Sequence, residues 1–314
     1  MITKNARSLA SGVAGMALVG GSVGVSQVLV DAPLFTAQAV RYAVAAAILV
    51  AVLRTARVRV RVVRPRGAEW LWLAGIAATG LVLFNVAVVR GVAHAEPAAI
   101  AVAVACVPVL LGVLGPLLER RVPHGRVVVA ALVVTAGSVL VEGTGRADAV
   151  GVAWAAVALL CEAAFTLLAV PVLPQHTAWG VSVHSVWMGA AIFLVLGVAV
   201  EGPGAVARLD AVDWAAIGYL AVLVTAVAFV LWYSAVASLG AGTVGLLTGV
   251  APVSAALTGL VTDGGTPSPM VWAGMLLILC GLAVGLATNP TVKTTRVRPQ
   301  YTPGRNLTIE ESLT

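Results

Sequence analysis

The chain has 314 residues, of which 60% are hydrophobic and only 10% charged, with a mean hydropathy of +1.03 and a formal net charge of +6. Soluble domains are usually about 45–50% apolar and about 25% charged, so this composition excludes water-soluble globules, and its low charge excludes a disordered chain. All three cysteines lie within apolar runs, which excludes a disulfide framework. The composition therefore predicts an integral membrane protein.

Ten stretches are long and apolar enough to cross a hydrocarbon core of roughly 30 Å as α-helices, which takes about 20 residues each. They cover residues 9–30, 35–53, 69–89, 95–117, 126–142, 149–172, 182–200, 213–237, 241–261 and 270–288. These runs are too long and too uncharged for the alternating strands of a transmembrane β-barrel. We therefore predict an all-α polytopic membrane protein whose backbone polar groups are satisfied within each helix.

The N-terminal segment carries Lys4 and Arg7 ahead of an apolar run, as a signal peptide does. The run is too long for a signal peptide and no convincing small-residue cleavage site follows it, so we interpret it as a retained first span. Within it, Gly20 and Gly24 form a small-residue pair that would let another helix approach closely. Such faces can also support a homodimer, and the sequence leaves that possibility open.

The second predicted span carries Gln38, Arg41 and Tyr42 in its outer part. A charge within the bilayer is costly and therefore informative. Arg41 is expected to snorkel outward, to form a salt bridge that locks two helices, or to contact an anionic group of a substrate. Gln38 and Tyr42 would supply polar or aromatic contacts to a cavity, as would Asn85 in the third span.

Arginines dominate the loop after the second span, in the run RTARVRVRVVRPRG. Such a patch can bind nucleic acid, but basic cytoplasmic loops are the rule in membrane proteins, so we predict no nucleic-acid partner. With a cytoplasmic N-terminus, 15 of the 19 Lys and Arg residues fall on the cytoplasmic side. We expect both termini in the cytoplasm. The preference for Arg over Lys is typical of a GC-rich bacterial gene, so the expected location is the inner membrane of a bacterial cell.

An offset of 144 residues aligns the two halves of the chain without a gap over the last three spans of each. Pro108-Val109 then falls on Pro252-Val253, and Glu119 falls on Asp263. Because each half holds five spans, an odd number, the second half must be inserted upside down. Inverted repeats of this kind are typical of secondary transporters, in which substrate binds near the midplane.

Pro108 and Pro252 lie near the middles of the fourth and ninth spans, where each would kink its helix and free a carbonyl. Their matching positions favour a pair of kinks beside a central cavity over ordinary helix kinks. Gly245 and Gly249 form a second small-residue pair in the ninth span, with packing as its expected role.

Glu162 lies within the run AWAAVALLCEAAFTLLAV. At about 1.5 Å of rise per residue, its place in the span 149–172 puts it near mid-bilayer. Desolvation there favours the protonated acid, so Glu162 is the best candidate to couple transport to protons or to bind a cationic group. The alternative is a permanently neutral or ion-paired structural acid. Further candidates for cavity contacts in the second half are Trp154, Trp232, Tyr233 and Thr248.

Motifs for catalysis are absent from the sequence, which has no HExxH, no Walker loop, no G-x-S-x-G and no His or Cys at metal-ligand spacing. We therefore predict no enzyme activity, no cofactor and no metal site. The two alternatives to a transporter are an intramembrane enzyme, which should cluster catalytic residues at one depth, and a membrane scaffold or sensor, which would need no polar cavity.

The stretch AEPAAIAVAVACVPVLLGVLGPLLERRVPHGRVVVAALVVTAGSVLV resembles the EamA module of the drug/metabolite transporter superfamily. Pro108, Glu119 and Gly137 match that module, and the second half repeats the match with Pro252, Asp263 and Gly281. Arg41-Tyr42 is similar to an Arg-aromatic pair early in the family's second helix. Asp263 stands where the family usually has Glu.

The resemblance implies one five-helix repeat over residues 1–146, an inverted repeat over 147–288, and a polar cytoplasmic tail over 289–314 that we expect to be disordered. It also implies a central cavity and the export of small metabolites, amino acids or drugs by exchange or ion coupling. The expected partners are the lipid bilayer, a small organic solute and protons.

Overall fold

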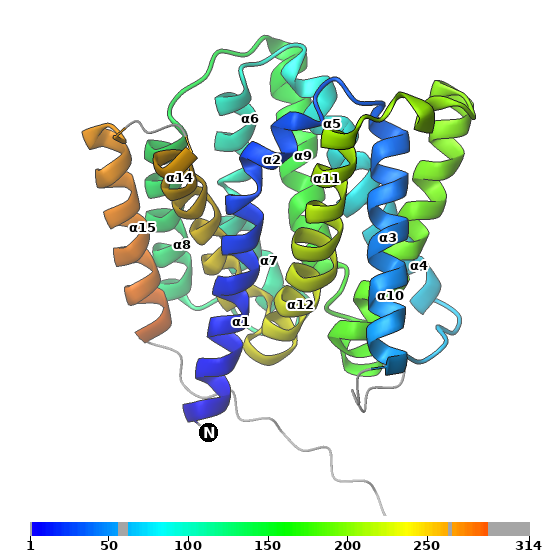
Figure 1. Ribbon diagram of the computed structural model, residues 1–314. Helices are drawn as coiled ribbons and strands as arrows, with labels where there is room; N and C mark the ends of the chain where they lie inside the picture. The colour runs from blue at the N-terminus through cyan, green and yellow to red at the C-terminus, as the bar shows by residue number, and fades with distance from the viewer. Residues whose placement is uncertain (1, 56–61, 263–265, 288–314) are drawn as a thin grey trace, which may run out of the picture.

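The computed structural model describes residues 2–55, 62–262 and 266–287. Nearly all of these residues are helical, and they contain no β-strand, only an isolated antiparallel bridge between Ala95 and Ala147. Asp263 and the tail 289–314 lie outside the described residues. We call the end of the bundle where the first helix begins the lower end and the opposite end the upper end (Figure 1).

The described residues form ten helical spans of sufficient length and apolarity to cross a membrane. The spans, numbered in chain order, are Asn5–Val28, Leu34–Thr55, Glu69–Val92, Pro97–Leu118, Gly125–Glu142, Ala149–Leu167, Leu173–Glu201, Ala211–Leu239, Ala241–Val261 and Pro269–Ala287. The predicted fold class is confirmed: the protein is an all-α polytopic membrane protein. The largest error concerns span 7, which begins at Leu173 rather than at residue 182. Its polar first turns resemble a loop in sequence, but they are helical, and His176 within them is buried and contacts Glu69 of span 3.

Four spans are continuous helices, and six are divided by a break or a change of helix type. The continuous ones are α3 (Leu34–Thr55), α8 (Gly125–Glu142), α9 (Ala149–Leu167) and α15 (Pro269–Ala287). The divided ones contain α1 (Ile2–Gly21) and α2 (Val23–Val28); α4 (Glu69–Gly75) and α5 (Phe84–Val92); α6 (Pro97–Val104) and α7 (Val107–Leu118); α10 (Leu173–Leu196); α11 (Ala211–Tyr219) and α12 (Ala228–Leu239); and α13 (Ala241–Gly245) and α14 (Val250–Thr262).

The irregular segments repeat along the chain. A π-helical segment Ile76–Leu83 separates α4 from α5 in span 3, and another, Leu220–Val227, separates α11 from α12 in span 8. Both bounds of the two segments differ by 144 residues, the offset at which the sequence aligns with itself. π-Helical turns are rare in proteins, so two π-helical segments separated by the same 144 residues support a structural repeat.

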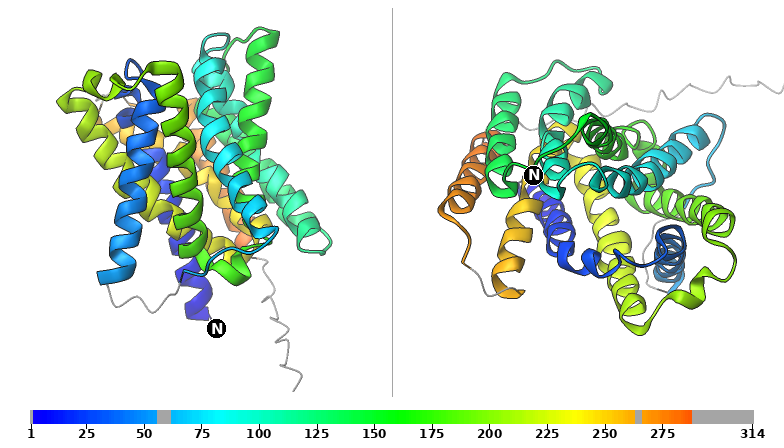
Figure 2. Two further views of the ribbon diagram at one scale, coloured as in Figure 1. Left: turned by 90° about the vertical axis from the view of Figure 1, so that its right-hand side faces the viewer. Right: turned by 90° about the horizontal axis from the view of Figure 1, so that it is seen from above.

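The two five-span halves pack against each other through matched pairs of spans. Span 2 packs on span 7 through α3 and α10, and span 5 packs on span 10 through α8 and α15 (Figure 2). Spans 3 and 4 contact span 6 in the same way that spans 8 and 9 contact span 1. Each half therefore packs against the other through several of its spans.

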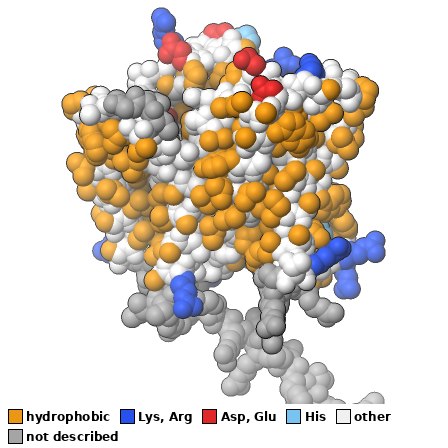
Figure 3. Space-filling model, in the orientation of Figure 1, with side chains coloured by type: hydrophobic (Ala, Val, Ile, Leu, Met, Phe, Trp, Pro, Cys, Tyr) orange, Lys and Arg blue, Asp and Glu red, His pale blue; other side chains and the backbone are white. Residues whose placement is uncertain are grey.

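The outer surface is a broad band of hydrophobic side chains, with acidic groups gathered at the upper end and basic groups mainly at the lower end (Figure 3). Long aliphatic side chains such as Leu160, Leu194 and Leu276 are more than half exposed on this band. Such exposure would be unfavourable in water and is expected against lipid tails.

Candidate functional site

A cavity of about 140 Å³ lies among spans 1, 2, 3, 6 and 8. It brings together five of the residues predicted from sequence, Arg41, Tyr42, Asn85, Glu162 and Trp232. The other lining residues are Met16, Val19, Gly80, Leu81, Phe84, Phe165, Val224, Ala228 and Phe229. Apart from the first five, the wall is apolar or aromatic.

Arg41 points into the bundle and does not snorkel outward. Its Nε donates to Thr225 Oγ1 at 2.9 Å and its Nη1 donates to Gln38 Oε1 at 3.3 Å. Its guanidinium carbon also lies 5.2 Å from the centre of the Tyr42 ring, within the range of a cation–π contact. All of these partners are neutral, and no described carboxylate pairs with Arg41. The positive charge is therefore held in place without being neutralised.

Glu162 lies on α9 and is half-buried beside the cavity. Within the described part of the chain it has neither a hydrogen bond nor an ion pair. Burying an unpaired carboxylate costs several kcal/mol unless a proton or a cation accompanies it. One small cavity is thus lined by a carboxyl group, that of Glu162, and a guanidinium group, that of Arg41, and the two do not pair with each other.

Aromatic side chains connect spans 6 and 8 around Glu162. Trp232 Nε1 donates to Thr166 Oγ1 at 3.0 Å, and Tyr233 Oη donates to the Phe165 carbonyl at 3.0 Å. The Phe165 ring centre lies 4.8 Å from that of Phe229. Tyr233 was predicted to contact the cavity, but it is fully buried and does not line it. Its hydrogen bond instead holds the backbone of α9 at Phe165, one turn below Glu162.

Two polar amide side chains, those of Gln38 and Asn85, respectively bond Arg41 and line the cavity. Gln38 is buried and acts on the cavity through its hydrogen bond to Arg41. Asn85 Nδ2 donates to the Leu81 carbonyl in its own span at 2.7 Å, which leaves the side-chain oxygen as its remaining acceptor beside the cavity.

The two predicted prolines interrupt their spans but do not line this cavity. Pro108 follows the break between α6 and α7, where the carbonyl of Ala105 accepts a hydrogen bond from Thr135 Oγ1 of α8 at 3.0 Å. Pro252 lies in the first turn of α14 and borders a separate groove between α8, α14 and α15. The carbonyl freed near Pro108 therefore bonds a neighbouring helix.

Trp154 and Thr248 also lie away from the cavity. Trp154 packs into a separate cluster around Ala87, Ile100 and Ala158 near the upper end. Thr248 Oγ1 donates to the Gly245 carbonyl of its own span at 2.8 Å. Trp154 therefore contributes to packing, and Thr248 satisfies its hydroxyl group within its own span.

The first predicted glycine pair is only half used within the chain. Gly20 contacts the backbone of Ala251 in α14 so closely that a Cβ would have no room. Gly24 has no atom within 4 Å of where its Cβ would lie, and it is exposed. Close helix packing thus depends on Gly20.

Both members of the second glycine pair allow a close approach between helices. A Cβ on Gly245 would lie 2.6 Å from Leu111 Cβ of α7. A Cβ on Gly249 would lie 2.5 Å from Val134 Cγ1 of α8. The pair joins span 9 to spans 4 and 5, so it is occupied within the chain.

Glu119, the acid of the first repeat motif, lies at the lower end of span 4. Its Oε1 accepts from the backbone N–H of Ala241, where span 9 begins, at 3.1 Å. Its Oε2 lies 3.6 Å from Arg121 Nη1. Glu119 therefore joins span 4 to its repeat counterpart, and Asp263, its own counterpart, lies outside the described residues.

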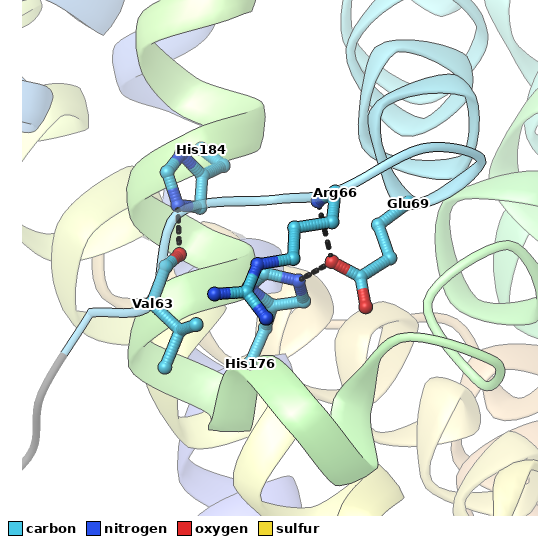
Figure 4. A network of polar contacts seen from close by, with 5 residues as sticks. All are labelled: Val63, Arg66, Glu69, His176 and His184. Carbon is cyan, nitrogen blue, oxygen red and sulfur yellow. Dashed lines mark hydrogen bonds and ion pairs between the residues drawn. The ribbon is translucent and has the colours of Figure 1, made fainter.

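A polar cluster joins spans 3 and 7 at the lower end (Figure 4). His176 is fully buried, and its Nε2 lies 3.0 Å from Glu69 Oε2, while Glu69 also accepts from the backbone N–H of Arg66 at 2.8 Å. His184 Nε2 lies 3.1 Å from the carbonyl of Val63. These contacts attach the described end of the basic loop to span 7.

Sequence reasoning missed several residues of the cavity wall. Phe165 follows Glu162 by one helical turn, and Phe229 precedes Trp232 by one turn, so each pair shares a helix face. A Cβ on Gly80 would lie 2.8 Å from Phe165 Cβ, so this glycine sets the spacing of spans 3 and 6. A spacing of three residues, from Glu162 to Phe165 and from Phe229 to Trp232, was the sequence pattern that indicated these two phenylalanines.

A family model of EamA-like transporters matches residues 8–142 and again residues 149–286. The chain belongs to the EamA-like transporter family. The family has two repeats of five helices, in agreement with the two sets of five spans and the repeated π-helical segments. It is thus a membrane transporter by family.

Among curated proteins, the EamA-like chain is 27% identical over 265 residues to the "Uncharacterized transporter YetK" of Bacillus subtilis, covering 82% of this chain and 80% of the relative. It is also 27% identical over 244 residues to the "Probable terminal-alkyne amino-acid exporter" of Streptantibioticus cattleyicolor, covering 77% of this chain and 80% of the relative. A solved crystal structure, described only as that of a protein, shares the fold with a TM-score of 0.73 at 19% identity, covering 89% of this chain and 97% of the other.

Proposed function

We propose that this EamA-like protein is a secondary transporter that exports small organic solutes by alternating access. The observation that carries the proposal is the cavity shared by Arg41 and Glu162, two charges without charged partners among the described residues. Ionisable groups facing a cavity within membrane spans characterise substrate and ion pathways. The two interlocked halves supply the architecture in which one half can rock against the other.

Glu162 is the coupling residue in this proposal. Its carboxyl group can hold a proton when the cavity is empty and release that proton when a cationic group of a substrate arrives, since only the ionised form needs a compensating charge in a desolvated site. The ionisable groups beside it are Arg41 and Tyr42 across the cavity, Cys161 next to it on α9, and Tyr233 on α12. Arg41 stays charged throughout, so the proton is carried by the acid.

The outward direction is supported by the relative named as an amino-acid exporter. The distribution of charge supports an orientation with both termini in the cytoplasm, because the described basic residues gather mainly at the lower end (Figure 3). The lower end is then the cytoplasmic end, and the bacterial relatives point to the inner membrane of a bacterial cell.

Proteoliposomes that hold the purified protein and a pH-sensitive dye in the lumen test the proposal. Four classes of probe are added outside: apolar amino acids, primary amines, short-chain carboxylates and aromatic cations. We expect at least one class to drive a change in lumenal pH above that of protein-free liposomes, because the substrate enters as a proton leaves. We expect Glu162→Gln, which cannot titrate, to abolish the pH change.

The matched control is Glu96→Gln, which removes an exposed acid paired with Arg146 at the upper end. It should leave the pH signal as in the wild type. Failure of all four classes to produce a signal or a flux of labelled probe contradicts transport. A pH signal that is unchanged in Glu162→Gln contradicts the coupling role alone.

A further inference from the structure

The cavity contains one positive and one negative side chain, and we propose that it binds a zwitterion, with a carboxylate on Arg41 and an ammonium group on Glu162. This inference rests on the proposed function of the cavity as a transport site. It specifies the substrate class as free amino acids or molecules with the same pair of charges. Each step below concerns one of the two charges or the wall between them.

Arg41 is built to receive a carboxylate. The guanidinium has five N–H donors, and Thr225 and Gln38 occupy two of them. These two hydrogen bonds and the Tyr42 ring fix the plane of the group without neutralising it. A preorganised guanidinium with free donors binds a carboxylate through two parallel hydrogen bonds, which is its favoured geometry.

Glu162 offers the complementary pole at a similar depth. Counting about 1.5 Å per residue from the upper ends of spans 6 and 8 places Glu162 and Thr225 both about 20 Å down. Because Arg41 reaches Thr225, its guanidinium approaches the level of the Glu162 carboxylate from another wall of the same cavity. A carboxylate only accepts hydrogen bonds, so an ammonium group, a pure donor, is its natural partner.

A ligand with a single charge would leave one of these side chains without a partner. A cation alone would leave the buried charge of Arg41 uncompensated. An anion alone would leave Glu162 either as an unpaired carboxylate, at the same kind of cost, or protonated and without the cationic partner that its ionised form can bind. A zwitterion satisfies both groups and adds no net charge to the cavity. Phe165, Phe229 and Trp232 line the remaining wall, which suits an apolar side chain on the ligand.

The volume limits the size of the ligand. Pockets for drug-sized molecules hold roughly 300–1,000 Å³. The cavity of about 140 Å³ is well below this range, so it suits a small amino acid rather than a peptide or a large drug. Acylation of the amino group would both remove the charge and add bulk.

The test compares norvaline with two analogues that each lack one pole, butylamine without the carboxylate and pentanoate without the ammonium group. Binding to the detergent-solubilised protein is measured by titration calorimetry, and competition is measured against exchange of labelled norvaline in proteoliposomes. We expect norvaline to bind at least about tenfold more tightly than either analogue, since each lost charged hydrogen bond is costly. N-acetylnorvaline should also fail to compete.

Variants of Arg41 and Glu162 test which residue binds which charged group of norvaline. In Arg41→Gln, norvaline affinity should fall about tenfold or more while that of butylamine stays the same. In Glu162→Gln, norvaline affinity should fall likewise while that of pentanoate stays the same. The controls Arg90→Gln and Glu96→Gln remove exposed charges near the upper end and should bind norvaline as the wild type does. Monodisperse elution and an unchanged thermal unfolding temperature show that each variant is folded; if a glutamine variant unfolds, Arg41→Lys and Glu162→Asp replace it, with weakened but still zwitterion-selective binding expected.

The outcomes separate this inference from the proposed function. Norvaline binding that depends on both residues without any flux supports the zwitterion site and contradicts transport. Flux or binding of butylamine or pentanoate as strong as that of norvaline overturns the zwitterion site and leaves transport standing. Absence of norvaline binding, or binding unaffected by both glutamine variants, also overturns it.

Discussion

Glu201 closes on Thr36 across the upper end of the protein: its Oε2 accepts from the Thr36 backbone N–H at 2.8 Å and from Thr36 Oγ1 at 2.7 Å. Its Oε1 accepts from the backbone N–H of Phe35 at 2.8 Å. The carboxylate at the end of span 7 thus caps the first turn of span 2, its repeat counterpart. Glu119 joins spans 4 and 9 in the same manner at the lower end.

Replacing Glu201 with Gln should destabilise the protein. One amide oxygen cannot reproduce three hydrogen bonds to a carboxylate, and the charge that favours a helix N-terminus is lost, so we expect a loss of about 1 kcal/mol. Unfolding in mixed detergent micelles measures the change. Glu96→Gln serves as the control, and equal stability of the two variants would show that the cap does not hold the spans together.

The glycine pair in the first span should divide into one sensitive and one tolerant position. Gly20→Ala places a methyl group against the backbone of Ala251, which cannot move aside cheaply, so we expect a loss of about 1–3 kcal/mol. Gly24→Ala meets open space and should be neutral or slightly stabilising, because alanine favours helix. Thermal unfolding of both variants checks this, and a reversed order would contradict the packing of α1 on α14.

Among the histidines, His176 should be the one whose substitution destabilises the protein most. Its side chain is fully buried, its Nε2 contacts Glu69, and its Nδ1 has no partner among the described residues. His176→Ala leaves a gap and removes the link between spans 3 and 7, so we expect a loss of about 2 kcal/mol. His124→Ala, at an exposed position near the lower end, is the control. Equal unfolding temperatures for the two variants would contradict a structural role for the cluster.

Asp148, at the upper end, should make a pH-dependent contribution to the stability of the folded protein. Hydrogen bonds from the Gly151 backbone and from His94 hold the pKa of Asp148 below its ordinary value of 3.8. Because the folded-state pKa is lowered, the stabilisation is complete at neutral pH and is lost as the pH falls from about 4 toward the folded-state pKa.

Asp148→Asn should therefore unfold at a lower temperature than the wild type at pH 7, and the difference should shrink as the pH is lowered toward 3. Thermal unfolding across this range measures it. Asp31→Asn, at an exposed upper position, controls for the general effect of removing an acid. A difference that grows on acidification would be opposite in sign to the proposed linkage.

Much of the site was predictable because membrane burial makes charge conspicuous. Arg41 and Glu162 stand out in apolar runs, and both line the cavity. The prolines were predicted to shape the same cavity, but the structure places them at breaks bonded to or bordering other helices. Sequence position gave their depth in the span, whereas the direction in which a break faces depends on the neighbouring helix.

The ten spans, their two sets of five and the offset of 144 residues can all be read from the sequence, because each follows from apolarity and pattern along the chain. The folded arrangement of the helices was needed to show that Arg41 turns inward to Thr225, 184 residues away, and that Glu162 has no partner within the described residues. Whether a buried charge is paired depends on which helices meet and at what depth. That is a property of packing between distant segments, and it is what distinguishes a structural ion pair from a binding site.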